Sequence, residues 1–132
     1  MTLDASDLQQ FHGGETRYRH WMTRFVVYTE GVKYLAELGE AYWLLDAIAS
    51  AFPTRRFLEA QATDPRIRSL HFWRLTVHDD QTAVLTARAD SGEEPFYRQR
   101  IPFTDFPLEE VAIWAGWDET LNAWVLHLPS EH

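Results

Sequence analysis

The chain has 132 residues, of which 45% are hydrophobic and 24% charged, a composition typical of one folded domain rather than a disordered segment. Its formal net charge of −8 at pH 7 argues against binding to nucleic acid or to a membrane surface, because both favour a cationic protein. The chain has no cysteine, no apolar run long enough to span a bilayer and no secretory signal, so we expect a cytoplasmic protein.

The N-terminal part predicts little regular structure. Residues 1–14 begin polar and end in Gly13-Gly14, so we expect a flexible segment with a short helix around Ala5–Phe11. A single α+β domain is expected to follow over residues 15–132. The run Phe25–Tyr28 is β-branched and aromatic, which indicates a short strand.

A helical region follows from about Gly31 to Phe52. Thr29 is a suitable N-cap, and Gly39 is a point at which the helix can bend or break. The second half, Ala41–Phe52, is apolar on nearly every side, which is typical of a buried helix. The region about 31–52 is therefore predicted to be the core helix of the domain, ending at Pro53.

The remainder of the chain changes from helical to strand periodicity. In the first strand Trp73, Leu75 and Val77 alternate with more polar residues, so one face is expected to be buried. Short polar turns separate five candidate strands, which are Arg68–His78, Thr82–Ala89, Pro95–Phe103, Glu109–Trp117 and Leu121–Leu128. Helices followed by strands predict an α+β fold in which the core helix packs on an antiparallel meander of about five strands.

Several segments of the chain resemble a family of small bacterial proteins classed as a domain of unknown function and often associated with mobile elements. The resemblance extends over about Phe11–Glu131 and is carried by Phe11–Trp21, Tyr28–Ala36, Ala41–Ile48, Trp73–Val77, Thr104–Leu108 and Leu128–Glu131. It implies a bacterial, cytoplasmic protein. It implies no known activity, and it transfers no site residues.

The motifs of common enzyme classes are missing from the sequence. There is no nucleophile elbow, no phosphate-binding loop and no dinucleotide-binding glycine pattern. The six histidines are not spaced as metal ligands, and His71 is expected to be a core residue. The sequence therefore predicts no cofactor, no metal and no catalytic residue.

Asp46 is one candidate site residue, because it lies within the most apolar segment of the chain. A carboxylate buried there would need a partner, and Arg17, Arg19 or Arg24 could provide it. The functional hypothesis is a pocket between the core helix and the sheet, lined by Asp46, Tyr42 and Trp43. The alternative is a buried carboxylate with a purely structural role, and the sequence favours that alternative.

A second candidate site is an arginine-rich face of the sheet. Of the twelve basic residues only Lys33 is a lysine, and several arginines of the strand region occupy even positions, as does one aromatic residue. If the strands pair in a suitable register, one sheet face could bind an anion or an acidic partner through Phe72, Arg74, Arg88, Arg98 and Arg100. The alternative is an ordinary solvated face.

Two functional hypotheses follow from these patterns. The first is a noncatalytic, acidic interaction protein that acts on a cytoplasmic protein partner, as an inhibitor encoded by a mobile element would. The second is a small enzyme or ligand-binding module with its pocket around Asp46. Under either hypothesis, homodimerisation could use an exposed strand edge or an exposed tryptophan among Trp114, Trp117 and Trp124.

Overall fold

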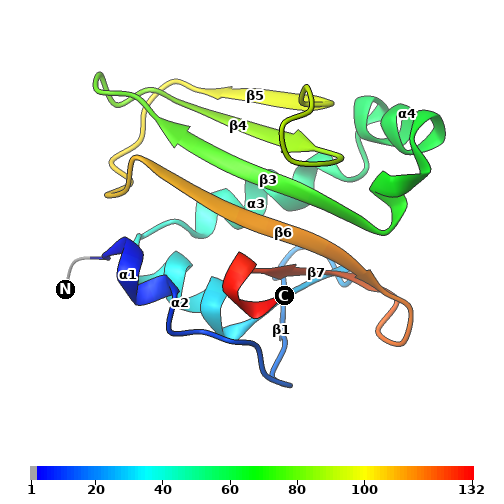
Figure 1. Ribbon diagram of the computed structural model, residues 1–132, viewed down its shortest axis with the longest axis horizontal. Coiled ribbons are helices and arrows are strands. Elements are labelled where there is room, and N and C mark those ends of the chain that lie inside the picture. Colours follow the sequence, from blue (N-terminus) through cyan, green and yellow to red (C-terminus); the bar gives the residue numbers. More distant parts are fainter. Residues whose placement is uncertain (1–2) are drawn as a thin grey trace.

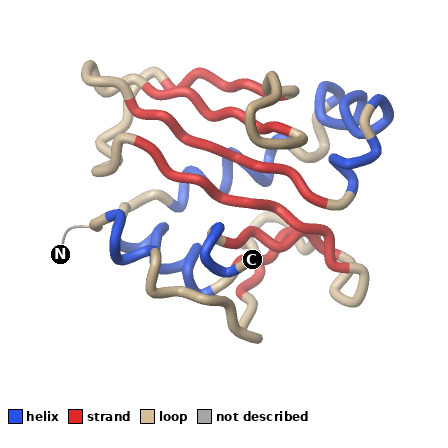
Figure 2. The backbone as a smooth tube through the Cα atoms, in the orientation of Figure 1, coloured by secondary structure: helices blue, strands red, loops and turns tan. Residues whose placement is uncertain are grey.

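The computed structural model describes residues 3–132, which form helices packed on one twisted β-sheet (Figures 1 and 2). The α-helices are α1 (Ala5–Leu8), α2 (Glu30–Leu38), α3 (Tyr42–Ala51) and α4 (Arg55–Thr63). The strands are β1 (Tyr18–Arg19), β2 (Val26–Tyr28), β3 (Leu70–Val77), β4 (Ala83–Arg88), β5 (Tyr97–Ile101), β6 (Glu110–Asp118) and β7 (Ala123–His127). Two short 3₁₀ helices are η1 (Pro65–Arg68) and η2 (Pro129–Glu131).

The sheet is larger than predicted and is not a meander. Its seven strands have the order β1-β2-β7-β6-β3-β4-β5, so the prediction of a five-strand antiparallel meander was wrong, although the α+β class holds. Strands β3, β4 and β5 are joined as hairpins, and the chain then returns so that β6 pairs with the free edge of β3. This arrangement is a Greek key. Strand periodicity does not reveal it, because alternation defines a strand's faces but not its neighbours.

The N-terminal strands complete the sheet by pairing with the last strand of the chain. β2 runs parallel to β7, with Val26 opposite Trp124 and Tyr28 opposite Leu126, and β1 pairs antiparallel with β2. The sheet is therefore mixed. A two-residue and a three-residue strand are too short to be assigned to a sheet from sequence alone.

The helical layer covers one face of the sheet and leaves much of the other face open (Figure 1), with α3 behind β3 and β6. On the covered face, Trp73, Leu75 and Ile113 are each 1% exposed, as the alternation in β3 predicted. Leu35, Leu44 and other apolar residues of the helices pack against them in one core cluster. No helix in the described part of the chain is both long and apolar enough to cross a membrane.

The predicted helical region is two helices rather than one. Thr29 is the N-cap of α2, as expected, and its side chain accepts a hydrogen bond from the backbone N–H of Val32. The chain breaks after Leu38, where Gly39 is the C-cap and Glu40 adopts a positive φ of 49°. A Cβ atom on Gly39 would lie 2.8 Å from the carbonyl oxygen of Leu35, so the turn requires glycine.

Helix α3 is not buried on every side, which corrects the prediction for Ala41–Phe52. Its Leu44, Leu45 and Ile48 side chains are buried, but Tyr42 is 41% exposed and the Asp46 side chain is 35% exposed. Residues 42, 46 and 50 are spaced by four and form the outer stripe of the helix. Three polar groups at that spacing are a sequence sign of an exposed side, which the prediction of a fully buried helix did not use.

Candidate functional site

The open face of the sheet carries all five residues of the predicted arginine-rich face. Phe72 lies opposite Arg88 in the β3–β4 register, and Arg98 and Arg100 of β5 lie opposite Thr86 and Val84 of β4. Directly paired residues point to the same face of a sheet. Arg74 belongs to this face because it is opposite Thr86. We call this surface the arginine face, made up of Phe72, Arg74, Arg88, Arg98 and Arg100.

A cavity of about 450 Å³ lies on the arginine face, between β3, β6 and the loop that joins β4 to β5. That loop passes in front of the strands (Figure 1), and its Gly92 has a φ of +82°, a conformation that favours glycine. The walls of the cavity are Phe72, Trp73, Arg74, Arg88, Asp90, Ser91, Gly92, Ala112 and Trp114. The cavity is large enough for a small ligand or for one or two side chains of a partner.

The loop over the cavity is held by two arginines. Arg66 donates to both carboxylate oxygens of Glu93, at 2.9 and 2.8 Å, and also to Asp64. Arg88 donates from Nε to the backbone oxygen of Glu93 at 3.0 Å. The hydrogen bonds from Arg66 lower the pKa of Glu93, so that carboxylate stays ionised and paired.

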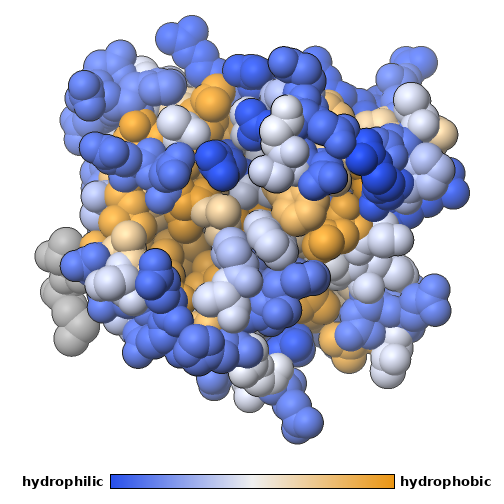
Figure 3. Space-filling view, in the orientation of Figure 1, coloured by the Kyte–Doolittle hydropathy of each residue, from blue (hydrophilic) through white to orange (hydrophobic). Residues whose placement is uncertain are grey.

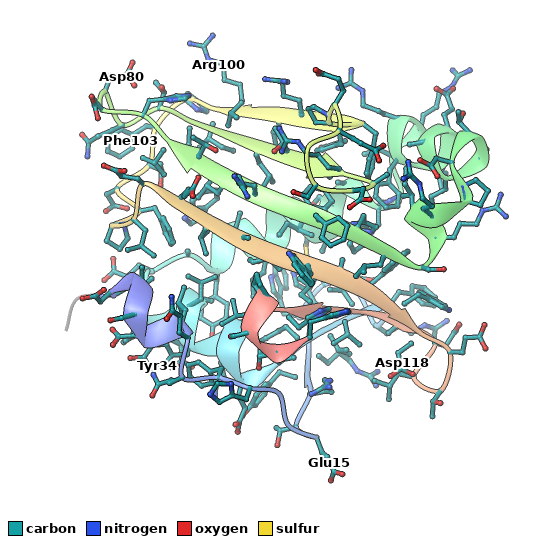
Figure 4. The ribbon with its side chains drawn as sticks, viewed as in Figure 1. Glu15, Tyr34, Asp80, Arg100, Phe103 and Asp118 are labelled. Atoms are coloured by element: carbon teal, nitrogen blue, oxygen red, sulfur yellow. The ribbon has the colours of Figure 1, made fainter. Side chains whose placement is uncertain are left out.

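The arginine face has more cations than carboxylates to neutralise them. Arg74 lies 3.6 Å from Glu110, and both side chains are more than half exposed, at 52% and 62%. Within residues 3–132, Arg88, Arg98 and Arg100 take part in no ion pair. Arg100 lies on the β5 edge of the sheet (Figure 4). Arg88 already donates to the Glu93 backbone and to Thr86, so the exposed Arg98 and Arg100 are the guanidinium groups best placed to pair with an external carboxylate or phosphate.

An aromatic pair borders the cavity. The rings of Phe72 and Trp114 meet edge to face with their centroids 4.9 Å apart, and the ring of His132 lies 5.0 Å from Trp114. Figure 3 shows hydrophobic surface between hydrophilic side chains on this side of the molecule. Sequence analysis did not include Trp114 in the site. Its even position in β6 was a usable sign, but only the pairing of β6 with β3 places it beside Phe72.

The second predicted site, around Asp46, has a different arrangement from the one expected. Asp46 Oδ1 accepts hydrogen bonds from His20 Nε2 and Trp21 Nε1, both at 2.8 Å, and not from Arg17, Arg19 or Arg24 as predicted. His20 Nδ1 also accepts from the backbone N–H of Met22 at 3.1 Å. Both ring nitrogens of His20 are thus occupied, and the contact serves to hold the β1–β2 loop on α3.

Tyr42 and Trp43 are not joined to Asp46 in a common polar cluster. The Tyr42 hydroxyl donates to Glu37 at 3.2 Å, and partial burial together with this carboxylate raises the pKa of Tyr42 to about 12. Trp43 packs against the core cluster. Tyr42 and Trp43 therefore add no polar group to the contact between His20 and Asp46.

Among the described residues three histidines are buried, two more than the single core histidine that the sequence predicted. His71 is fully buried, as predicted, and His20 and His127 are 4% and 9% exposed. Within residues 3–132, no group of three or more histidine or carboxylate side chains is arranged to hold a metal ion. Of the tryptophans predicted for an interface, Trp124 is only 7% exposed, and Trp114 and Trp117 are half-buried. Trp21, which was not predicted for an interface, is 75% exposed.

The sequence of this chain was compared with the models of known protein families. The model of a family of unknown function, DUF6876, matches residues 2–132. The chain belongs to the DUF6876 family. This agrees with the resemblance to a domain of unknown function noted from the sequence. The comparisons of this DUF6876 chain with curated proteins and with solved structures found no match.

Proposed function

We propose that this chain is a noncatalytic interaction protein that binds an acidic segment of a protein partner on its arginine face. The observation that carries the proposal is the strand register, which puts Arg74, Arg88, Arg98 and Arg100 on one face of the sheet. Arg74 and Arg88 line a cavity of about 450 Å³ on that face. Arginine pairs with carboxylates in a fixed two-point geometry. The aromatic pair Phe72 and Trp114 would bind an apolar side chain next to the acidic ones.

The net charge of −8 does not prevent this interaction. At physiological salt the screening length is about 8 Å, so an acidic segment in contact with the face is affected mainly by the nearby arginines. The distant carboxylates act mostly on the approach of the partner, and they favour partners that also carry a basic surface.

The region around Asp46 supports the alternative of an enzyme or ligand pocket less well. One oxygen of Asp46 accepts from both His20 and Trp21, and the Tyr42 hydroxyl is directed to Glu37. Acid and base catalysis needs two placed groups with access to a substrate. His20 and Asp46 are two such groups, but the His20 ring is buried and both of its nitrogens are already hydrogen-bonded.

The source and location of the protein are part of the proposal. The resemblance noted from the sequence supports a bacterial protein associated with mobile elements. The absence of cysteine supports a cytoplasmic location. The proposed role is that of an inhibitor of a host protein, which a small protein that binds a partner through one surface can fill.

The first test uses a fluorescent peptide of glutamate and tyrosine, with binding measured by anisotropy at low and high salt. The double variant Arg98→Glu/Arg100→Glu should weaken binding by about tenfold or more, because two attractive charges become repulsive. The matched control is Arg55→Glu/Arg56→Glu on α4, which changes the net charge equally; Arg55 is 92% exposed. Equal weakening by both variants would show that net charge, not the arginine face, governs binding.

The second test captures partners from a bacterial lysate with the tagged chain at two salt concentrations, followed by mass spectrometry. A partner that binds the wild type and the α4 control, but not the β5 double variant, supports the proposal. A partner retained equally by all three proteins would contradict it.

A further inference from the structure

A second cavity lies on the opposite face of the sheet, the one that the helices cover. It is an apolar cleft of about 310 Å³ between the start of β2, the end of α3 and the β6–β7 hairpin. Its walls are Thr23, Phe25, Val26, Ala49, Phe52, Pro53, Trp117 and Trp124. The arginine face lies on the opposite side of the sheet, so this cleft is independent of the proposed function.

The walls of the apolar cleft are fixed by aromatic packing. The Trp117 and Trp124 rings are 5.4 Å apart, and Phe52 lies 5.5 Å from Trp124. Behind them the buried ring of His71 lies 4.7 Å from Trp124. Such walls do not need to rearrange to receive a ligand, and preformed apolar concavities are typical of small-molecule sites.

A smaller, basic cavity adjoins the apolar cleft, with Phe25 as their common wall. It measures about 160 Å³ and is lined by Arg19, Arg24, Phe25, Leu121 and Asn122. Leu121 and Asn122 belong to the turn after Asp118, which Figure 4 labels at the end of β6. Arg19 and Arg24 form no ion pair with the rest of residues 3–132.

Phe25 connects the two cavities chemically as well as spatially. It is 46% exposed, and the guanidinium carbon of Arg24 lies 5.2 Å from its ring centroid. A ligand whose apolar body contacts Phe25 in the cleft would therefore place a head group near Arg24. The pair of cavities offers an apolar compartment next to a cationic one.

We propose that these two cavities form one binding site for a small apolar carboxylate. The apolar body fills the cleft between Phe52, Trp117 and Trp124, and the carboxylate pairs with Arg24, which lies over the shared Phe25 ring. Arg19 is opposite Val27 and therefore points to the other face of the sheet. A single negative charge suits one exposed arginine. A more highly charged phosphate would be opposed more strongly by the net charge of −8.

The test titrates the full chain with octanoate and, in parallel, with octanol and octylamine. Binding is measured by calorimetry, and the site by the NMR signals of the Trp117 and Trp124 indole groups. Octanoate should bind at least about tenfold more tightly than octanol, octylamine should bind most weakly, and both indole signals should shift.

Two variants test the two halves of the site, and a third variant is the control. Arg24→Gln should reduce octanoate affinity by about tenfold while leaving octanol affinity unchanged. Ala49→Leu should abolish binding of both, because the larger side chain fills the cleft. Arg55→Gln on α4 is the control, and it should bind like the wild type.

Several results would overturn the inference. Equal affinity for octanoate and octanol would show that the basic cavity does not bind the carboxylate. Equal losses in Arg24→Gln and Arg55→Gln would show a nonspecific effect of charge. Octanoate binding without a shift of the Trp117 or Trp124 indole signals would place the ligand elsewhere. Because Arg24 is exposed, that variant remains informative even if Ala49→Leu fails to fold.

Discussion

The indole N–H of Trp73 donates to Nδ1 of His71 at 2.7 Å, in the centre of the aromatic core. Since the indole nitrogen is only a donor, Nδ1 must be the acceptor and the neutral ring must carry its proton on Nε2. Nε2 finds no hydrogen-bond partner among residues 3–132. The imidazole is packed between aromatic rings, including those of Phe57 and Trp124, which offer no hydrogen-bond acceptor and keep out the water that would solvate a charged ring.

This burial makes the stability of the fold depend on pH. Burial lowers the pKa of His71 from 6.5 to about 3, so between these values the unfolded chain binds a proton that the folded chain excludes. The neutral, buried His71 therefore makes its full contribution to the free energy of unfolding at pH values well above 6.5. The free energy of unfolding decreases as the pH falls toward 3. From pH 6.5 to pH 5 the loss amounts to about 2 kcal/mol.

His71→Gln tests this prediction, because glutamine can still accept from Trp73 but does not titrate. Urea denaturation at a series of pH values should show a smaller loss of stability for this variant than for the wild type. His78→Gln, at an exposed position after β3, should keep the wild-type slope. Identical slopes for the wild type and His71→Gln would contradict the assignment.

Glu131 connects the two ends of the domain. Its carboxylate accepts from the Thr29 hydroxyl at 2.6 Å, from the Leu128 backbone N–H at 2.9 Å and from the Gly31 N–H at 3.3 Å. Hydrogen bonds to a charged group are worth about 1.5–3 kcal/mol. We expect Glu131→Ala to lower the free energy of unfolding by about 2–3 kcal/mol in urea titrations. Glu119→Ala, in the exposed β6–β7 turn, should change it little, and a similar loss in both variants would count against this role.

Arg66 holds the loop over the arginine face through its paired hydrogen bonds to Glu93. Arg66→Gln should increase amide hydrogen exchange in residues 90–95 and weaken binding of the acidic peptide. The wild-type loop should also exchange faster at high salt, because the ion pair is exposed and therefore screened. Arg55→Gln, whose ion pair with Glu59 lies on α4, should leave the loop unchanged. Unaltered exchange in Arg66→Gln would show that the loop is held by Arg88 alone.

Asp46 is predicted to contribute to stability but not to binding at the arginine face. Asp46→Ala leaves His20 Nε2 and Trp21 Nε1 without their acceptor. Because the His20 side chain is only 2% exposed, we expect a loss of about 1–3 kcal/mol in the free energy of unfolding. Peptide affinity should stay unchanged, and Asp79→Ala in the exposed β3–β4 turn should affect neither property. Loss of peptide binding in a folded Asp46→Ala protein would revive the pocket hypothesis.

The sequence alone determined the α+β class, the existence of the longer strands and several local features. Thr29 was identifiable as a cap, since a side-chain oxygen before a helix satisfies a free N–H. His71, Trp73 and Leu75 were identifiable as core residues from alternation in one strand. The arginine face could be predicted in part for the same reason. Alternate residues of one strand lie on the same face of a sheet, so the even-numbered residues of each strand were expected to share a side.

Tertiary structure decided how these pieces fit together. The return of β6 to β3, the parallel pairing of β2 with β7 and the position of Trp114 beside Phe72 all depend on contacts between distant segments. The hydrogen bond between Asp46 and His20 also depends on such contacts, because His20 reaches Asp46 only once the β1–β2 loop folds onto α3. Periodicity is a property of one segment, whereas strand neighbours are chosen by burial of the whole sheet against the helices.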